Sequence, residues 1–119
     1  MIYDINNIFA KILRGEIPCA TLYEDEWALA FNDIAPAAPV HVLVIPKGPY
    51  VSLDDFTLNG SNNEIAGFYR AVGKVARDLG LALTGYRTLS NTGLYGGQEV
   101  PHFHVHLFGG KPLGPMLAR

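Results

Sequence analysis

The chain contains 119 residues, and 49% of them are hydrophobic, which suffices for one domain with a packed core. With 9 Lys and Arg residues against 11 Asp and Glu, the formal charge is -2, and no basic run is present. This pattern argues against binding to a nucleic acid polymer but is compatible with a small anionic ligand.

The sequence also suggests where the protein works. Cys19 is the single cysteine, so no internal disulfide can form, which is typical of a reducing intracellular setting. Residues 1–18 carry charges throughout and lack the apolar stretch of a secretion signal. The longest apolar stretch, residues 35–46, is too short to span a bilayer and is interrupted by prolines and a histidine. We therefore expect a cytoplasmic protein with no membrane partner.

A short amphipathic helix is predicted near the N-terminus. Asp4 is positioned to cap this helix, and Gly15 with Pro18 ends it. Its apolar face consists of five residues at helical spacing, namely Ile5, Ile8, Phe9, Ile12 and Leu13.

Three strands are predicted after this helix. From Thr21 on, large side chains alternate with small or polar ones around a charged turn at residues 24–26, which is typical of a hairpin. The large residues are Trp27, Leu29 and Phe31. A proline-rich connection at 35–39 leads to the apolar run 41–45, closed by Pro46, which we expect to form a central strand buried on both faces.

A second helix is predicted to begin at Ser61, because Ser61 and Glu64 form the S-x-x-E capping-box pattern. It ends before Gly80. Its apolar face has the 3/4 spacing of a helix and consists of Ile65, Phe68, Val72, Val75 and Leu79.

Two more strands complete the expected fold, at about 86–91 and 99–108, joined by the glycine-rich segment 92–97. The tail at about 109–119 is expected to be irregular. The element order predicts an α+β fold, with an antiparallel sheet of about five strands and two helices, as a single domain over residues 1–119.

Three of the 4 histidines stand at alternate positions within residues 101–108. In a strand His102, His104 and His106 share one face, while the apolar residues between them point into the core. Successive histidine Cα atoms are then roughly 6.6–7 Å apart, close enough to act on a single phosphate-sized group. Imidazole can serve there as a nucleophile, a proton donor or a metal ligand.

A metal site is the main alternative for these histidines. Three histidines with a water form a known catalytic zinc arrangement, to which Glu99 and the distant His41 could contribute. No cysteine or acidic ligand completes an evident metal motif. We therefore favour nucleophilic phosphoryl chemistry, and expect no metal or other cofactor.

Polar and glycine residues before the histidines suit phosphate chemistry. Glycines in 93–97 allow backbone N–H groups to approach an anion, and the amides of Asn91 and Gln98 can bind phosphate or leaving-group atoms. Glycine clusters are more often simple hairpin turns, so the weight of this segment lies in its position directly before the histidines.

Asp33 stands near a predicted strand end, after Phe31 and before Ile34, where a carboxylate can accept both hydroxyls of a ribose. The pattern alone favours a turn-forming Asp over this binding role. His41 is by default a hydrogen-bonded histidine of the core.

Together these residues resemble the histidine-triad (HIT) family, whose signature is His-x-His-x-His followed by two apolar residues. The resemblance covers nearly the whole chain and is strongest to the bacterial members of the Hint branch, the purine nucleoside phosphoramidases. The matching segments are 8–18, 31–33, 38–47, 91–98 and 109–110.

The resemblance implies a role for each histidine. His104 would be the nucleophile that forms a nucleotidyl-histidine intermediate, which water then hydrolyses. His102 would orient His104, with the His102 carbonyl as acceptor for its other ring N–H. His106 would bind the phosphate and help protonate the leaving amine, and His41 would complete the network.

The resemblance also implies a substrate and a binding site. The family hydrolyses the P–N bond of AMP or GMP amides, and aminoacyl-adenylates present the same reacting centre. Asp33 matches the ribose-binding acid. The apolar slot for the base matches Ile8, Phe9, Ile12, Phe31 and Ile34, and the phosphate-side positions match Asn91, Gly97, Gln98 and Glu99.

Hint relatives are homodimers, so a homodimer is expected here. Two functional alternatives stay open from the sequence. One is a nucleotide-binding interaction module with incidental catalysis, and the other is a metal-dependent phosphoesterase that uses the histidines as ligands.

Overall fold

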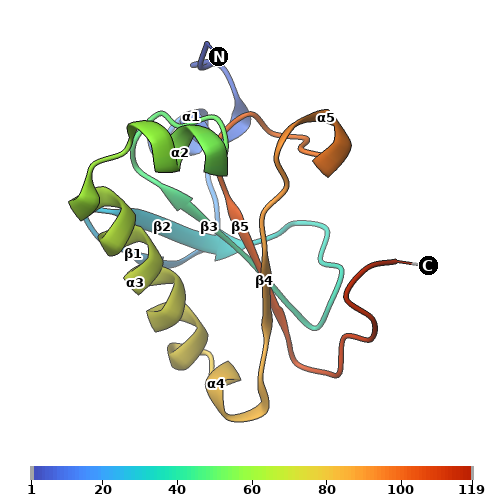
Figure 1. Ribbon diagram of the computed structural model, residues 1–119. Coiled ribbons are helices and arrows are strands. Elements are labelled where there is room, and N and C mark those ends of the chain that lie inside the picture. The colour runs from blue at the N-terminus through green and yellow to red at the C-terminus, as the bar shows by residue number, and fades with distance from the viewer. Residues whose placement is uncertain (1, 119) are drawn as a thin grey trace.

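The computed structural model describes residues 2–118, and an antiparallel sheet lies at its centre (Figure 1). Within these residues the sheet has five strands in the spatial order β1-β2-β3-β5-β4. They are β1 (Thr21–Glu24), β2 (Ala28–Asn32), β3 (Val40–Pro46), β4 (Arg87–Leu89) and β5 (Val105–Gly109). All neighbouring pairs are antiparallel, which confirms the predicted α+β class and sheet.

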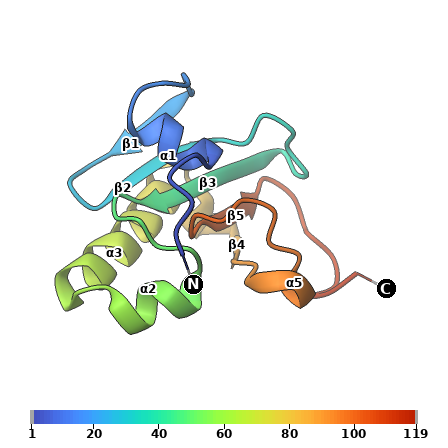
Figure 2. The ribbon, with the colours of Figure 1, turned by 90° about the horizontal axis from the view of Figure 1, so that it is seen from above.

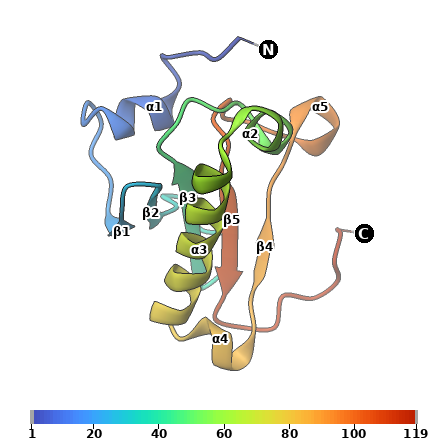
Figure 3. The same cartoon turned by 60° about the vertical axis from the view of Figure 1, so that its left-hand side comes forward.

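Helices cover both faces of this sheet. The helix α3 (Asn62–Asp78) lies against one face and α1 (Ile8–Leu13) against the other, as Figure 2 shows. The remaining helices of residues 2–118 are α2 (Leu53–Asn59), α4 (Leu81–Thr84) and α5 (Gly93–Gly96). Figures 1 and 3 place α1, α2 and α5 at the same end of the sheet. None of the helices described between residues 2 and 118 is long and apolar enough to cross a membrane.

The capping box predicted at Ser61 is present at the start of α3. The Glu64 backbone N–H donates to the Ser61 hydroxyl, and the Ser61 backbone N–H donates to the Glu64 carboxylate. Leu79 is the C-cap, directly before Gly80. The buried face of the helix consists of Phe68, Ala71, Val72, Val75 and Ala76.

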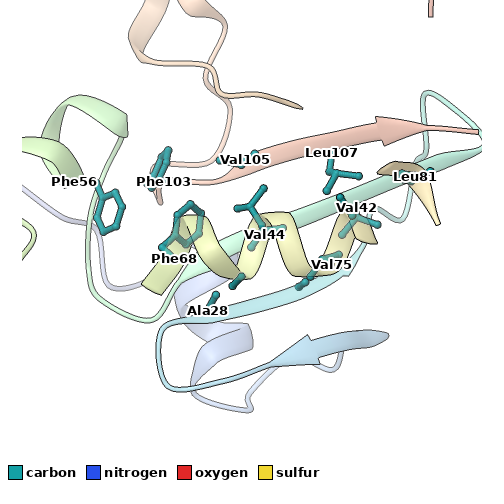
Figure 4. Close-up of a cluster of buried hydrophobic side chains, with 14 residues drawn as sticks. Ala28, Val42, Val44, Phe56, Phe68, Val75, Leu81, Phe103, Val105 and Leu107 are labelled. Atoms are coloured by element: carbon teal, nitrogen blue, oxygen red, sulfur yellow. The ribbon is translucent and has the colours of Figure 1, made fainter. Parts of the chain in front are cut away.

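The main hydrophobic core lies between α3 and the sheet (Figure 4). Phe103 packs against Phe56 and Phe68, with ring centroids 5.1 and 5.2 Å apart. Val105 and Leu107 continue this core along β5. The apolar residues between the histidines therefore point into the core, as predicted, and anchor the chain that carries the histidines.

The central strand β3 is buried on both faces, which confirms its prediction. Val42 and Val44 belong to the core under α3. Leu43 and Ile45 belong to a second cluster, together with Phe9 of α1. This second cluster supports the face of the sheet on which the histidines meet.

The first helix begins later than predicted. Its N-cap is Asn7, whose side chain accepts the Ala10 backbone N–H, and not Asp4. Asp4 accepts the Asn6 backbone N–H in a turn before the helix, so Ile5 precedes α1. Asp and Asn share the same preference for caps and turns, and the sequence offered both within one turn.

Three helices, α2, α4 and α5, are present beyond the two that were predicted for this chain, counted over residues 2–118. Ser52 caps α2, but this helix buries only Phe56 and so has almost no apolar periodicity. The helices α4 and α5 are single turns of 4 residues beside glycines. Segment 92–97, expected to be a plain connection, thus contains α5.

The last two strands are shorter than predicted. β4 does not fill residues 86–91, and β5 begins well inside the predicted range 99–108. Pairing between β4 and β5 stops where Leu89 lies opposite His106. His102 and His104 therefore lie in the chain that leads into β5, outside the paired strand.

The predicted hairpin is present as β1 and β2, although Trp27 lies just before β2. Residues 110–118 contain no helix or strand after β5. The predicted domain and tail also include Met1 and Arg119, which lie outside the described residues.

Gly67 of α3 is expected not to tolerate a side chain, because an added Cβ would lie 2.3 Å from the Trp27 ring. Gly67→Ala should lower the free energy of unfolding by about 1–3 kcal/mol. In the matched control, Gly73→Ala in the same helix, the added Cβ meets only the flexible Arg77 guanidinium, at 3.1 Å. Gly73→Ala should be neutral or stabilising by up to about 1 kcal/mol. Urea unfolding of both variants measures the difference, and equal effects would contradict this packing.

Candidate active site

A cleft of about 320 Å³ opens on the face of the sheet that carries α1. Residues from α1, the end of β2, β3, the segment around α5 and β5 contribute to it. Its lining consists of Phe9, Asp33, Ala35, His41, Leu43, Asn91, Gly97, Glu99, Val100, His104 and His106. A larger hollow of about 730 Å³, between β4 and the C-terminal tail, contains no histidine. The chemistry predicted from the histidines therefore belongs to the smaller cleft.

The register of β3 and β5 brings His41 and His106 together. Leu43 lies opposite His106, and His41 lies opposite Phe108, so the two histidines are diagonal neighbours on one face. Their nitrogens, His41 Nε2 and His106 Nδ1, are 2.9 Å apart. The sequence supplied both residues as candidates, and the sheet places them in direct contact.

Hydrogen bonds define which nitrogen carries the proton in this pair. The Ala37 backbone N–H donates to His41 Nδ1 at 3.0 Å, so the proton of a neutral His41 is on Nε2. His41 Nε2–H then donates to His106 Nδ1, which leaves the His106 proton on Nε2. An Asp33 carboxylate oxygen lies 3.4 Å from His41 Nε2. The pair thus presents a donor, His106 Nε2–H, to the cleft.

The ring of His104 is held by the backbone of its own segment. His104 Nδ1–H donates to the His102 carbonyl at 2.7 Å, so a neutral ring has its lone pair on Nε2. Phe9 packs edge-on against the His104 ring, with centroids 5.0 Å apart, and His104 is only 6% exposed. His104 therefore contributes a fixed imidazole with a free lone pair to the floor of the cleft.

His102 does not line the cleft. Its ring is fully buried, with Nε2–H donating to the Pro46 carbonyl at 3.0 Å. The Tyr3 hydroxyl donates to His102 Nδ1 at 2.6 Å. The sequence gives no signal for Tyr3 at this site, because it lies in irregular chain before α1 and no pattern connects it to a histidine so distant in sequence. Both ring nitrogens of His102 are thus occupied, and its carbonyl is the group that reaches His104.

Burial lowers the pKa of all four histidines below its ordinary value. The pKa of His102 and that of His106 fall to about 4, and neighbouring histidines add to the effect. The carboxylates of Asp33 and Glu99 partly oppose the lowering of the His104 pKa. At neutral pH the four rings are therefore uncharged, which is the state a nucleophilic imidazole requires.

Asp33 combines the two roles considered for it. One carboxylate oxygen accepts the Ala35 backbone N–H at 2.8 Å, which is the turn-forming role. The other oxygen faces His41, and Asp33 lines the cleft. The turn therefore fixes a carboxylate that is still available to a ligand.

The predicted phosphate-side residues divide into two groups. Asn91, Gly97 and Glu99 line the cleft. Gln98 does not line it, because its amide nitrogen donates to the Val51 and Val100 carbonyls. Its side-chain oxygen accepts the Gly93 backbone N–H, so Gln98 holds the segment around α5 in place.

The predicted apolar slot is only partly at the cleft. Phe9 lines it, whereas Phe31 and Ile12 lie in the hydrophobic cluster around Phe9. Ile8 is 44% exposed and Ile34 is 98% exposed, and neither lines the cleft. Leu43 and Val100 line the cleft without having been predicted. Leu43 shares the strand face of His41, and Val100 stands at an even position like the three histidines, so alternation was the signal that could have identified both.

The arrangement of donors does not favour a metal site. With both nitrogens of His102 occupied, the three histidines of the motif cannot act together as ligands. The ligand atoms of Asp33, His41 and His106 do lie within 4.8 Å of one another. However, His41 Nδ1 accepts a backbone N–H, so coordination through Nε2 would leave His41 without a proton on either nitrogen. Ligating histidines normally donate their second N–H.

Comparisons with known proteins agree with this fold. The HIT domain family model matches residues 14–113. An uncharacterised 13.2 kDa HIT-like protein of Azospirillum brasilense is 60% identical over 117 residues, covering 98% of this chain and 96% of that protein. The purine nucleoside phosphoramidase of Escherichia coli K12 is 44% identical over 111 residues, covering 93% and 92%. A solved histidine triad protein from Clostridium difficile has a TM-score of 0.87 at 40% identity, covering 98% of this chain and 100% of that chain.

The chain therefore belongs to the HIT family. Its similarity to the Escherichia coli phosphoramidase supports the Hint-like branch that the sequence resemblance indicated.

Proposed function

We propose that this protein hydrolyses the P–N bond of purine nucleoside 5′-phosphoramidates, such as AMP or GMP amides, through a nucleotidyl-His104 intermediate. One observation carries the proposal. The His102 carbonyl accepts the Nδ1 proton of His104, so that the Nε2 lone pair remains free in the cleft. The relative named purine nucleoside phosphoramidase supports this hydrolase class. Aminoacyl-adenylates offer the same phosphorus to attack and are included as substrates.

In the first step, the His104 Nε2 lone pair forms a bond to the α-phosphorus, and the P–N bond to the amine breaks. The departing amine takes a proton from His106 Nε2. Binding of the phosphoryl anion favours uptake of one proton from solvent by the His41–His106 pair, so the pair is left neutral after His106 Nε2 gives its proton to the amine. The products of this step are the free amine and a nucleotidyl group on His104.

In the second step, water attacks phosphorus, the bond to His104 Nε2 breaks, and neutral His106 takes the proton from water. AMP leaves, His106 releases this proton to solvent, and both histidines return to their neutral starting forms. The sum is AMP-amide plus water giving AMP plus amine. His41 keeps His106 oriented through the hydrogen bond between their rings.

The remaining cleft residues bind the nucleotide in this proposal. Asp33 accepts the ribose hydroxyls with the oxygen that faces the cleft. The base lies against the apolar side of the cleft at Phe9, which the neighbouring Ile12 and Phe31 support from within their shared cluster. The phosphate side is formed by Asn91, Gly97 and Glu99, with Gln98 supporting the segment that carries them.

A homodimer, a single HIT domain over residues 1–119 and a cytoplasmic location complete the proposal. Large apolar side chains lie exposed in the single chain, which supports burial against a second copy. They include Leu83, Leu94, Tyr95, Met116 and Leu117.

Hydrolysis of adenosine 5′-phosphoramidate in excess EDTA tests the function. The native protein should release AMP and ammonia at the same rate with and without the chelator. Loss of activity in EDTA that zinc restores would establish a metal-dependent phosphoesterase instead. Tight AMP binding without turnover would establish a nucleotide-binding module.

A further inference from the structure

The charge of the cleft is unusual for a site that binds a phosphoryl anion. Among the described residues that line it, two are carboxylates, Asp33 and Glu99, and none is Lys or Arg. The histidines are uncharged at neutral pH, as shown above. The cleft is therefore negative before an anionic substrate enters, and like charges in a partly enclosed site repel. A substrate that carries its own positive charge would remove this conflict.

The two carboxylates differ in how they are engaged. Asp33 is held by the Ala35 N–H and faces His41. Glu99 lies on the exposed segment between α5 and β5, and within residues 2–118 its carboxylate has no hydrogen-bond or ion-pair partner. Its charge opposes the lowering of the His104 pKa, so the field of Glu99 reaches His104. Glu99 is thus the carboxylate that is free to meet a ligand.

The direction of attack places the leaving group near the mouth of the cleft. His104 is buried at the floor, and an in-line displacement expels the leaving group on the side of phosphorus opposite to Nε2. Glu99 is exposed and lines the cleft, so it stands at the rim. An amine that departs toward the rim moves into the field of this carboxylate.

We propose that Glu99 makes the cleft selective for phosphoramidates whose leaving amine carries a second, cationic group. Suitable leaving groups are diamines and the amines of basic amino acids, in which an ammonium or guanidinium lies a few bonds from the scissile nitrogen. This inference rests on the proposed function and adds the class of amine to it. Glu99 acts here on the substrate, as a specificity-determining residue.

Three AMP amides with leaving amines of similar length test the inference. They are the amides of 1,4-diaminobutane, which is cationic, of n-pentylamine, which is neutral, and of 4-aminobutanoate, which is anionic. At low ionic strength the native protein should hydrolyse the cationic amide with a kcat/KM roughly five- to tenfold above that of the neutral one. The kcat/KM for the anionic amide should be lower than that for the neutral one, and added salt should reduce both differences in kcat/KM.

Two variants that each remove one negative charge distinguish the effect of a charge in the cleft from that of a charge elsewhere on the surface. Glu99→Gln should bring the ratio of cationic to neutral kcat/KM to about one and raise the relative rate of the anionic amide. Glu26→Gln is the matched control, because Glu26 is exposed and lies outside the cleft lining. It should retain the native ratio.

The outcomes distinguish the two proposals. If the neutral amide is hydrolysed but the cationic-to-neutral ratio is one, or is unaltered by Glu99→Gln, the cation selectivity is wrong and the phosphoramidase function stands. If none of the three amides is hydrolysed, the proposed function is wrong and the selectivity falls with it.

Discussion

Replacing His104 by Ala is expected to lower kcat/KM for adenosine 5′-phosphoramidate by at least about 10⁴-fold. The reason is that no other cleft histidine has an equivalent lone pair. His106 Nδ1 already accepts a proton from His41, and His106 Nε2 carries its own. Steady-state kinetics with the pure variant measures the loss.

Comparing the loss of kcat/KM in His104→Ala with that in His106→Ala provides a control for this result. His106→Ala should cost less, about 10²-fold, because it removes proton transfer and phosphate binding but leaves the nucleophile. Far-UV circular dichroism and urea unfolding should show that both variants stay folded. A His104→Ala variant within tenfold of native activity would contradict the role of His104.

Acidification is expected to destabilise the fold through the buried histidines. The His102 pKa is about 4 in the folded chain and about 6.5 when unfolded. Between these values the unfolded chain binds more protons, so stability is lost as pH falls from about 6.5 toward 4 and is fully present above 6.5. Going from pH 7 to about 4.5, His102 alone should lower the free energy of unfolding by about 2–3 kcal/mol. His106 acts in the same direction.

Urea unfolding at pH 7, 5.5 and 4.5 measures this dependence. The variant His102→Gln has no titrating group at this position and should show a shallower loss of stability over the same range. A native protein with equal stability at all three values, or a variant as steep as the native protein, would contradict the burial of a neutral His102.

Much of the fold was predictable because its main elements have strong local signals. The capping box at Ser61 and the apolar run of β3 identified elements that the structure confirms. The short helices α2, α4 and α5 were not predictable from periodicity, because too few of their side chains are buried. At the first helix the sequence analysis assigned the cap to Asp4, whereas the structure uses Asn7, a residue type with a similar capping preference.

The sequence indicated which residue types would meet at the cleft, but not how each side chain would be oriented. Alternation indicated that His102, His104 and His106 share one side, yet only the last two line the cleft. The direction of the His102 ring depends on Tyr3 and on the Pro46 carbonyl, which are contacts between distant parts of the chain. Such contacts leave no periodic trace in the sequence.

The predicted nucleotide-binding residues also differ in how well the sequence could place their side chains. For Asp33, directly after the end of β2, the sequence pattern favoured a turn-forming role, and the folded chain places the same side chain at the cleft as well. Gln98 lies in a loop, where its amide is taken up by the Val51 and Val100 carbonyls. For loop residues the competing backbone partners become known only from the folded chain.

Stereochemistry at phosphorus tests the covalent His104 intermediate most directly. One diastereomer of an adenosine 5′-thiophosphoramidate is hydrolysed in ¹⁸O-labelled water, and the configuration of the thiophosphate product is determined. Two successive in-line displacements, first by His104 and then by water, predict overall retention of configuration. Overall inversion would mean a single direct attack by water, and it would contradict a nucleotidyl-histidine intermediate.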